Sequence, residues 1–344
     1  MTDALPETMF AVIQTRDGYS GRAEGPVIDD AANYLENADV PVPTPGPGEV
    51  LIKVRMAAVN PSDMHFIKGE YGQPNVKGAP AGFEACGDVV AAGKGAEGLV
   101  GQRVGFVASV SGAWADYAVT NAMMCVPLHP DLRDEDGAAQ IVNPLTAIGM
   151  IDIAAQAGDA VVISAAASQL GKLMIALAKA RGLKTIAMVR RMETAQTLMD
   201  LGATTVLDVT DDGFGDAFKA ASKELKPRVF LDAVTDQISE TVFANMPNKG
   251  RWIIYGKLSP APVSMSQLGG LVFSLKQIEG FWLTRWMQEQ TPEQMMAFAK
   301  EVQGYYLAGT WATDVSTYLP LKDVVTGLAN ATKQKDGKVM ITAS

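Results

Sequence analysis

"AVVISAAASQLGKLMIALAKARGLKTIAMVRR", residues 160–191, is the stretch of sequence that decides the fold. Apolar runs at 160–164 and 184–189 flank a loop of small residues and a segment of helical character. In that segment Leu170, Leu173, Leu177 and Ala180 recur at the spacing of one apolar helix face. A strand, a helix and a second strand in this order predict a parallel sheet with a right-handed crossover.

The same alternation continues along the chain. Further apolar runs that predict strands lie at 205–208, 228–234, 251–256 and 277–283. Repeated strand-helix-strand units predict a doubly wound α/β domain of the kind that binds nucleotides. We place this dinucleotide-binding domain at residues 144–285.

The residues on either side have a different pattern. Short β-like runs at 49–59, 87–93, 102–108 and 115–120 are separated by Pro and Gly, which is typical of a compact, mostly antiparallel, barrel-like domain. A mixed pattern resumes after about residue 285. We therefore expect a discontinuous substrate-binding and catalytic domain, formed by residues 1–143 and 286–344.

Composition limits the classes of function. The chain has 344 residues, 48% of them hydrophobic, which suits two globular domains, and no apolar run is long enough for a membrane span. The formal net charge of -9 argues against nucleic-acid and anionic-membrane partners. Cys86 and Cys125 cannot form a disulfide framework or a four-cysteine zinc site, and we expect both to be buried. The N-terminus lacks the features of a targeting segment, so we expect a cytoplasmic protein.

The loop after the first strand of the nucleotide domain is the candidate cofactor loop. Compared with G-x-G-x-x-G, it keeps only Gly171, with Ala166 and Ser168 at the earlier glycine positions. Small residues still let a pyrophosphate approach the backbone, and the helix N-terminus supplies oriented amides. A tight turn that holds no ligand is the alternative.

Two arginines predict which dinucleotide binds. Arg190 and Arg191 lie about 20 residues beyond the loop, where an NAD-binding enzyme places an acidic residue for the ribose hydroxyl. A charge-assisted hydrogen bond to a 2'-phosphate contributes roughly 1.5–3 kcal/mol, so one such contact favours NADPH roughly ten- to a hundredfold. Solvated surface arginines are the alternative.

The segment "VNPSDMHFIKGEYG", residues 59–72, holds a candidate proton donor, Tyr71. A tyrosine with its ordinary pKa near 10 is protonated at neutral pH and can donate to a developing oxyanion or carbanion. Such a donor contributes roughly 10²- to 10³-fold in rate. The chain has only His65 and His129, which excludes a histidine-rich metal site and disfavours a Ser-His-Asp triad. A packing role is the alternative for Tyr71.

The two-domain order resembles the medium-chain dehydrogenase/reductase superfamily, and within it the mitochondrial-type 2-enoyl thioester reductases. The similarity is carried by "NPSDMHFIKGEYG", "GAWADYAV", "VNPLTA", "MVRR", "IIYGKL" and "GFWLTRW". It implies a GroES-like, mostly antiparallel domain and a Rossmann-type domain. The positions of the superfamily's zinc ligands hold Asn60 and Phe83, so no metal is expected. The loop "SAAASQLG" departs from the family's N-A-S-N-S-x-V-G.

The resemblance also implies roles for individual residues. Tyr71 would be the proton donor, and the substrate pocket would include Asn60, Phe83 and Trp282. The NADPH site would be lined by Asn143, Thr146, Ala167, Ser168, Gln169, Leu170, Arg190, Arg191, Met192, Tyr255, Gly256, Lys257, Leu258, Phe281, Trp282, Leu283 and Lys338. Core packing is the alternative for Phe281 and Trp282, and a solvated surface position is the alternative for Lys338.

The predicted reaction is reduction of the C=C bond of an α,β-unsaturated carbonyl compound, foremost a 2-enoyl thioester, in the cleft between the domains. NADPH passes hydride to the β-carbon, and Tyr71 or a water bound to it protonates the α-carbon or the enolate oxygen. An NADPH:quinone or alkenal/enone oxidoreductase is one alternative, and a non-enzymatic NADPH-binding structural protein is another. The resemblance implies a homodimer formed through edge strands of the nucleotide domain.

Overall fold

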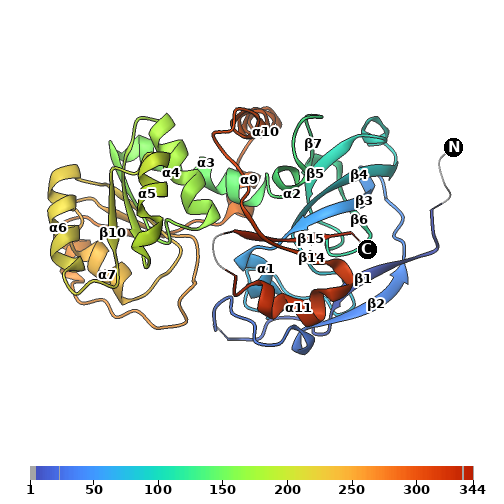
Figure 1. Cartoon of the computed structure of the whole chain (residues 1–344), viewed down its shortest axis with the longest axis horizontal. Coiled ribbons are helices and arrows are strands. Elements are labelled where there is room, and N and C mark those ends of the chain that lie inside the picture. The colour runs from blue at the N-terminus through green and yellow to red at the C-terminus, as the bar shows by residue number, and fades with distance from the viewer. Residues whose placement is uncertain (1–4, 23, 335–336, 344) are drawn as a thin grey trace. The chain divides into compact units, whose positions relative to one another are not determined.

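A computed structural model describes residues 5–22, 24–334 and 337–343 (Figure 1). It divides the chain into two compact units, one of residues 1–142 and 299–344 and the other of residues 143–298. The chain enters the second unit at the start of α3 (Val142–Ala157) and returns within α10 (Pro292–Leu307). The domain boundaries expected from the sequence stay a prediction, because compactness does not show which parts fold independently.

The first unit is built on a seven-stranded sheet, antiparallel except for one parallel pair. The order is β14-β15-β3-β4-β5-β7, with β6 also paired to β3, and only β14 and β15 run parallel. A separate antiparallel pair joins β1 to β2. The elements are β1 (Thr8–Gln14), β2 (Leu35–Pro41), β3 (Glu49–Ala58), α1 (Pro61–Ile67), β4 (Glu84–Ala92), β5 (Arg103–Val107), β6 (Tyr117–Asn121), β7 (Cys125–Pro127), α2 (Asp134–Ala138), β14 (Val315–Pro320), α11 (Val324–Ala331) and β15 (Lys338–Thr342).

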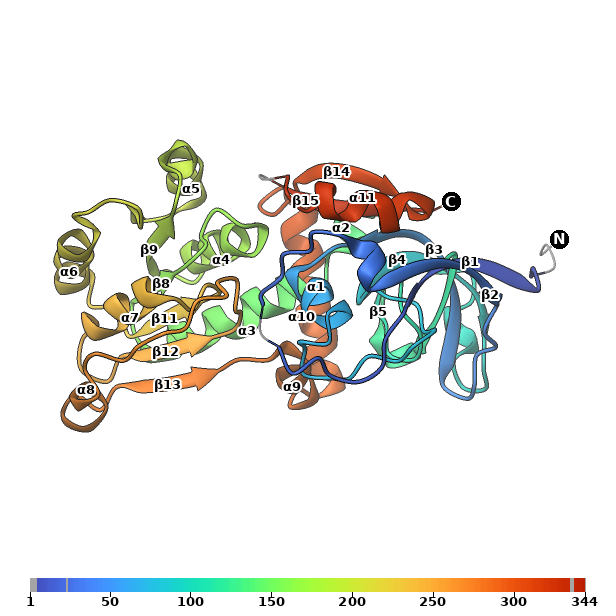
Figure 2. The same cartoon turned by 90° about the horizontal axis from the view of Figure 1, so that it is seen from below.

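The second unit contains a six-stranded parallel sheet in the order β10-β9-β8-β11-β12-β13. Numbered along the chain, this is the 3-2-1-4-5-6 order of a Rossmann fold. Figure 2 labels five of these strands, β9, β8, β11, β12 and β13, in this order. The elements after α3 are β8 (Ala160–Ile163), α4 (Gln169–Ala180), β9 (Lys184–Val189), α5 (Ala195–Leu201), β10 (Thr205–Asp208), α6 (Phe214–Leu225), β11 (Val229–Asp232), α7 (Gln237–Ala244), β12 (Arg251–Ile254), α8 (Gly269–Phe273), β13 (Gln277–Gly280) and α9 (Leu283–Gln288). The predicted fold class, an antiparallel domain and a doubly wound domain, is confirmed.

Each unit has its own hydrophobic core. The central strands of the second unit explain why the parallel sheet could be predicted from apolar runs in the sequence. Every residue of β8 and β11 is buried, as expected of parallel strands covered on both faces, so these strands appear as continuous apolar runs. Trp252, Phe230 and Phe218 form the centre of the second core, and Trp114 and Phe106 lie in the first. Among the described residues, no helix is both long and apolar enough to cross a lipid bilayer.

The last strand of the parallel sheet is shorter than predicted. The run 277–283 was expected to be one strand, but β13 ends at Gly280, and Trp282 is the residue that precedes α9. An apolar run alone cannot locate the point where a strand gives way to a helix.

Candidate active site

Tyr71 lies just after α1 in the first unit and packs in a cluster of three aromatic rings. Its ring centroid is 5.1 Å from that of Phe83 and 6.4 Å from that of Phe66, and the Phe66 and Phe83 centroids are 4.9 Å apart. The Tyr71 side chain is half-buried against the core. The structure therefore brings together Tyr71 and Phe83, two residues that the sequence analysis assigned to one site.

The backbone around Phe83 is held from two sides. Gly82 has φ +91°, and a Cβ built there would lie 2.2 Å from the indole ring of Trp114, so only glycine fits. The amide of Phe83 donates to Asp63 Oδ1 at 2.8 Å. Asp63 is fully buried in α1 and also accepts from the Asn60 amide at 2.7 Å. The backbone at Phe83 is thus held by a residue of the helix that precedes Tyr71.

Beneath the aromatic cluster lies a buried polar network of Asn60, Asp63, Glu84 and Lys338. Asn60 Nδ2 donates to Glu84 Oε1 at 2.9 Å, and Lys338 Nζ donates to Asn60 Oδ1. Burial raises the pKa of Asp63 to about 7, raises the pKa of Glu84 and lowers the pKa of Lys338. Attraction between the lysine and the two carboxylates opposes each of these shifts.

Asn60 and Phe83 occupy the positions at which the sequence analysis looked for metal ligands, and neither provides a thiolate or an imidazole. Asn60 was expected in the substrate pocket, but it is 2% exposed and both of its amide heteroatoms are engaged by Glu84 and Lys338. Within the described ranges, no group of three or more His, Cys, Asp or Glu side chains could hold a metal ion.

Lys68 and Glu70, which the sequence analysis did not single out, fasten an N-terminal loop to the segment that carries Tyr71. The buried Lys68 ammonium donates to Gly25 O at 2.7 Å and lies 3.3 Å from Glu70 Oε1. Glu70 Oε2 accepts from the Glu24 amide at 3.0 Å. His65 lies 3.5 Å from Glu70, and burial lowers the pKa of this histidine, which favours the neutral imidazole.

In the second unit, the loop after β8 leads into α4. Ser168 caps the helix by accepting the Gly171 amide at 3.1 Å. A Cβ built on Gly171 would lie 2.4 Å from the carbonyl oxygen of Ala166, so the single glycine kept from the fingerprint is sterically required. This close approach of helix to loop is the packing that the third glycine permits in dinucleotide-binding folds.

Asp232 ties the loops after β8 and β11 together, although the sequence analysis did not identify it. Its buried carboxylate accepts from Ser164 Oγ at 2.6 Å and from Trp252 Nε1 at 2.9 Å. It also accepts from the amides of Val234 and Thr235. Because β8 and β11 are neighbours at the point where the strand order reverses, Asp232 shapes the edge of the sheet at which such folds bind nucleotides.

Tyr255 follows β12 at the same edge of the sheet. Its hydroxyl is buried and has no hydrogen-bond partner among the described residues. Burial, and after it the negative charge of Asp232, raises the pKa of Tyr255, so the hydroxyl remains a donor. A buried hydroxyl without a hydrogen-bond partner destabilises a protein core. The Tyr255 hydroxyl could instead donate to an oxygen atom of a bound ligand, such as a phosphate oxygen. Nearby Lys257 donates to Thr235 O at 2.8 Å and Ala261 O at 2.7 Å.

Most of the predicted cofactor residues meet at the carboxyl edge of the parallel sheet. Residues 167–170, 190–192, 255–258 and 281–283 follow β8, β9, β12 and β13 respectively. Arg190 is exposed and Arg191 half-buried, while Trp282 is 41% exposed. Asn143 and Thr146 lie in the first turns of α3 in the same unit. Lys338 lies in the first unit, where it is buried.

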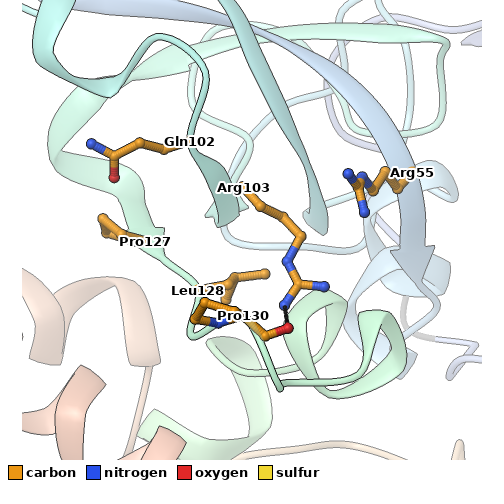
Figure 3. A pocket seen from close by; sticks show the side chains of 6 residues that line it. All are labelled: Arg55, Gln102, Arg103, Pro127, Leu128 and Pro130. Carbon is orange, nitrogen blue, oxygen red and sulfur yellow. Dashed lines mark hydrogen bonds between the residues drawn. The ribbon is translucent and has the colours of Figure 1, made fainter.

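The first unit also has a surface recess of about 430 Å³, whose lining contains none of the residues assigned to the cofactor or to proton donation (Figure 3). It is lined by Arg55, Gln102, Arg103, Pro127, Leu128 and Pro130. The Arg103 guanidinium donates to Asp134 at 2.8 Å and to His129 O at 2.7 Å, and Arg55 donates to Asp88 at 2.6 Å. The guanidinium groups of both arginines are therefore engaged in hydrogen bonds within the protein.

Residues 46–130 match the alcohol dehydrogenase GroES-like domain family, and residues 170–301 match the zinc-binding dehydrogenase family. The mitochondrial enoyl-[acyl-carrier-protein] reductase of Dictyostelium discoideum is 30% identical over 253 residues, which are 71% of this chain and 71% of that protein. The chain belongs to the medium-chain dehydrogenase/reductase superfamily. Its enoyl reductase-like character, inferred from the motifs, is confirmed.

Two solved structures are similar to this protein over nearly the whole chain. A candidate NADPH:quinone reductase from Mesorhizobium loti is 44% identical, has a TM-score of 0.94 and aligns over 98% of this chain and 99% of that chain. A mycobacterial protein solved in complex with NADPH is 26% identical, with a TM-score of 0.79 over 97% of this chain and 99% of that chain. One matching family is named for zinc, but the two positions at which the superfamily resemblance places zinc ligands hold Asn60 and Phe83 in this chain.

Proposed function

We propose that this protein is an NADPH-dependent reductase of the C=C bond of 2-enoyl thioesters. The observation that carries the proposal is the placement of the half-buried Tyr71 against Phe83, the residue that replaces a metal ligand. A phenol in this place offers proton donation where the superfamily's zinc enzymes use a Lewis acid. The similarity to an enoyl-[acyl-carrier-protein] reductase supports a thioester as the acceptor.

The second unit fits an NADPH molecule. Gly171 lets α4 pack closely on the loop after β8, and the N-terminus of α4 presents amides to a pyrophosphate. The buried Tyr255 hydroxyl lacks a partner in the described chain, and exposed Arg190 lies where a 2'-phosphate would be recognised. The similar mycobacterial protein was solved with NADPH. When bound, NADPH supplies the hydride that reduces the β-carbon.

The first unit supplies the proton. Tyr71 holds a proton on Oη and delivers it, directly or through one water, to the α-carbon or the enolate oxygen of the substrate. The products are the saturated thioester and NADP⁺, and the phenolate is then reprotonated from solvent. Phe66 and Phe83 restrict the motion of the Tyr71 ring and form an apolar wall beside it, which keeps the hydroxyl oriented.

Reduction of quinones or of enals and enones is the second candidate function. Its support is the 44% identity to the Mesorhizobium loti protein described as a candidate NADPH:quinone reductase. These acceptors lack a pantetheine arm, so they need no site for a phosphorylated nucleotide. An NADPH-binding protein that reduces neither class is the outcome that would refute both candidates.

A matched substrate panel tests the assignment. NADPH oxidation is followed at 340 nm with crotonyl-CoA, 2-hexenal and 1,4-benzoquinone, for the wild type and Tyr71→Phe, and with NADH in place of NADPH. The proposal predicts a preference for the thioester and a loss of at least about tenfold on removal of the hydroxyl. Fast quinone turnover that does not depend on the hydroxyl would refute the thioester assignment and leave Tyr71 a packing residue.

We also propose that two copies associate through the edge strand β13. β13 pairs with β12 on one side. Ile278 of β13 and Val272 and Phe273 of the preceding helix α8 are 41%, 66% and 87% exposed. Edge strands with exposed apolar side chains favour pairing with another chain. Light scattering should give twice the mass of the chain, and Phe273→Glu should shift the mass toward the monomer. A monomeric wild type would refute the homodimer.

The cytoplasmic location stays a prediction that cell fractionation would test.

A further inference from the structure

The segment that follows β1 makes contacts that the proposed proton transfer does not use. We call residues 17–22 and 24–27 of this segment the strap. The strap runs beside the part of the chain that carries Tyr71, and at one end of it the Lys77 amide donates to Asp17 Oδ1 at 2.7 Å.

The strap closes the loop that carries Tyr71 at both ends. Gly69 O accepts from the Ser20 amide at 2.8 Å, and the backbones of Gly18 and Asn75 exchange two hydrogen bonds of 2.9 and 3.0 Å. Only one residue separates Gly18 from Ser20, so the strap holds the two ends of the loop close together. Closing a short loop in this way removes conformational freedom from the residues inside it, and Tyr71 is one of them.

The contact between the strap and Gly69 is too close for a side chain. Gly69 has φ +74°, and a Cβ built there would lie 2.8 Å from the Ser20 nitrogen and 3.4 Å from the Gly18 carbonyl oxygen. Glycine therefore both adopts the left-handed backbone and lets the strap lie directly against the loop. At the other end, Asn75 Nδ2 donates to Ile67 O at 3.1 Å, which ties the loop to the last residue of α1.

Two buried charged side chains, Lys68 and Glu70, attach the strap further along. The Lys68 ammonium donates to Gly25 O at 2.7 Å, and Glu70 Oε2 accepts from the Glu24 amide at 3.0 Å. The two charges lie 3.3 Å apart, and the side chains are only 4% and 2% exposed. Each side chain bonds the strap directly, so removing the Lys68 ammonium removes one attachment and leaves the Glu70 carboxylate buried without this cation.

We propose that the strap holds the proton-donating Tyr71 in place by closing its loop, and that Lys68 is the positioning residue that keeps the strap closed. The proposal rests on the proposed function, because it takes the Tyr71 hydroxyl as the proton donor. Opening the strap should therefore slow the reaction. It should not weaken NADPH binding, because most of the residues assigned to NADPH lie in the other unit.

Gly69→Ala and Gly78→Ala form a matched pair that tests the contact with the strap. Both glycines lie in the first unit and have left-handed backbones, with φ +74° and +82°, so alanine is strained at each. A Cβ at Gly69 would lie 2.8 Å from the Ser20 nitrogen, whereas a Cβ at Gly78 meets nothing within 4 Å. Only Gly69→Ala should push the strap away from the loop.

Lys68→Met and Lys276→Met form a second matched pair. Lys276 is 9% exposed in the second unit and donates to the carbonyl oxygens of Phe243 and Ala244 at 2.9 and 2.8 Å, so this control also removes a buried ammonium. All four variants are made with and without Tyr71→Phe. The measurements are hydrogen exchange of the strap by mass spectrometry, NADPH affinity by fluorescence titration, and kcat and KM for the acceptor of the substrate panel that is reduced fastest.

The proposal predicts that Gly69→Ala and Lys68→Met each speed hydrogen exchange in the strap and lower kcat, both at least about tenfold, and change NADPH affinity less than about twofold. Neither should lower kcat further in the Tyr71→Phe background. Gly78→Ala and Lys276→Met should leave strap exchange and kcat within about twofold of the wild type. Should Lys68→Met fail to fold, Lys68→Met with Glu70→Gln removes both buried charges and should show the same changes.

Three results would overturn the proposal. Unchanged exchange in the strap of Gly69→Ala and Lys68→Met would show that these residues do not keep it closed. Faster exchange with an unchanged kcat would show that the strap does not position Tyr71, and an equal loss of kcat in the Tyr71→Phe background would show a role that does not pass through the hydroxyl. If Tyr71→Phe itself keeps full activity, the proposed function fails and the positioning role with it, whereas the exchange rates still show whether Lys68 keeps the strap closed.

Discussion

Gly171→Ala tests the claim that the loop after β8 is a cofactor cradle closed by a tight contact with α4. The added Cβ would lie 2.4 Å from Ala166 O, whereas real Cβ atoms essentially never come closer than 3.0 Å, so loop and helix must separate by about 0.6 Å. Overpacking of this kind costs roughly 1–3 kcal/mol, and the better helix propensity of Ala returns up to about 1 kcal/mol. The difference lies between about 0 and 3 kcal/mol, and we expect a net loss near the middle of this range.

The assay combines thermal unfolding with NADPH titration, and Gly215→Ala is the control. Gly215 lies in α6 of the same unit, and a Cβ built there meets nothing within 4 Å, so this change should stabilise the protein by roughly 0.5 kcal/mol. Gly171→Ala should lower Tm by about 2–8 °C and weaken NADPH binding at least about tenfold. If Gly171→Ala raises Tm as Gly215→Ala does and binds NADPH normally, the cradle is refuted.

Three further changes test other parts of the site. Burial raises the pKa of the Asp63 carboxyl to about 7, whereas the same carboxyl in the unfolded chain releases its proton near pH 4. The folded state therefore binds one more proton between about pH 4 and 7, so the free energy of unfolding falls as pH rises through this range. Asp63→Asn should flatten the fall in Tm between about pH 4 and 7, and an unchanged slope would contradict this. Trp252→Phe removes the 2.9 Å hydrogen bond to Asp232 and should lower the free energy of unfolding by about 2 kcal/mol in urea titration, whereas an unchanged midpoint would count against it. Arg190→Ala should weaken NADPH binding about tenfold and leave NADH binding unchanged, and equal losses for both would exclude 2'-phosphate recognition.

The parallel sheet could be predicted because burial on both faces makes its central strands β8 and β11 continuous apolar runs. β8 and β9 lie within one residue of the predicted runs. The end of β13 could not be predicted, because the residues after Gly280 stay apolar while the chain turns toward α9. Tyr71 could be identified from the sequence because it is a possible proton donor in a segment without metal ligands. Its contact with Phe83 could not be predicted, because it depends on packing between residues that no local sequence pattern shows.

The buried network was missed for a physical reason. Lys338 and Asn60 are 278 residues apart, and Asn60 and Glu84 are 24 apart, so only the fold brings them together. Charged residues are also rarely fully buried, which makes a solvated position the natural expectation for any lysine. One part was readable: Asn60 followed by Asp63 three residues later has the spacing of a capping box at the start of a helix.

The most direct test of the central claim follows labelled hydrogen into the product. Crotonyl-CoA is reduced in ordinary water with NADPH in which both hydrogens at C4 of the nicotinamide are replaced by deuterium, and the product is examined by mass spectrometry and NMR. The account predicts butyryl-CoA with one deuterium at C3 and a solvent hydrogen at C2, formed at least about tenfold more slowly by Tyr71→Phe. Formation of no butyryl-CoA, or of the same product at the same rate without the Tyr71 hydroxyl, would contradict it.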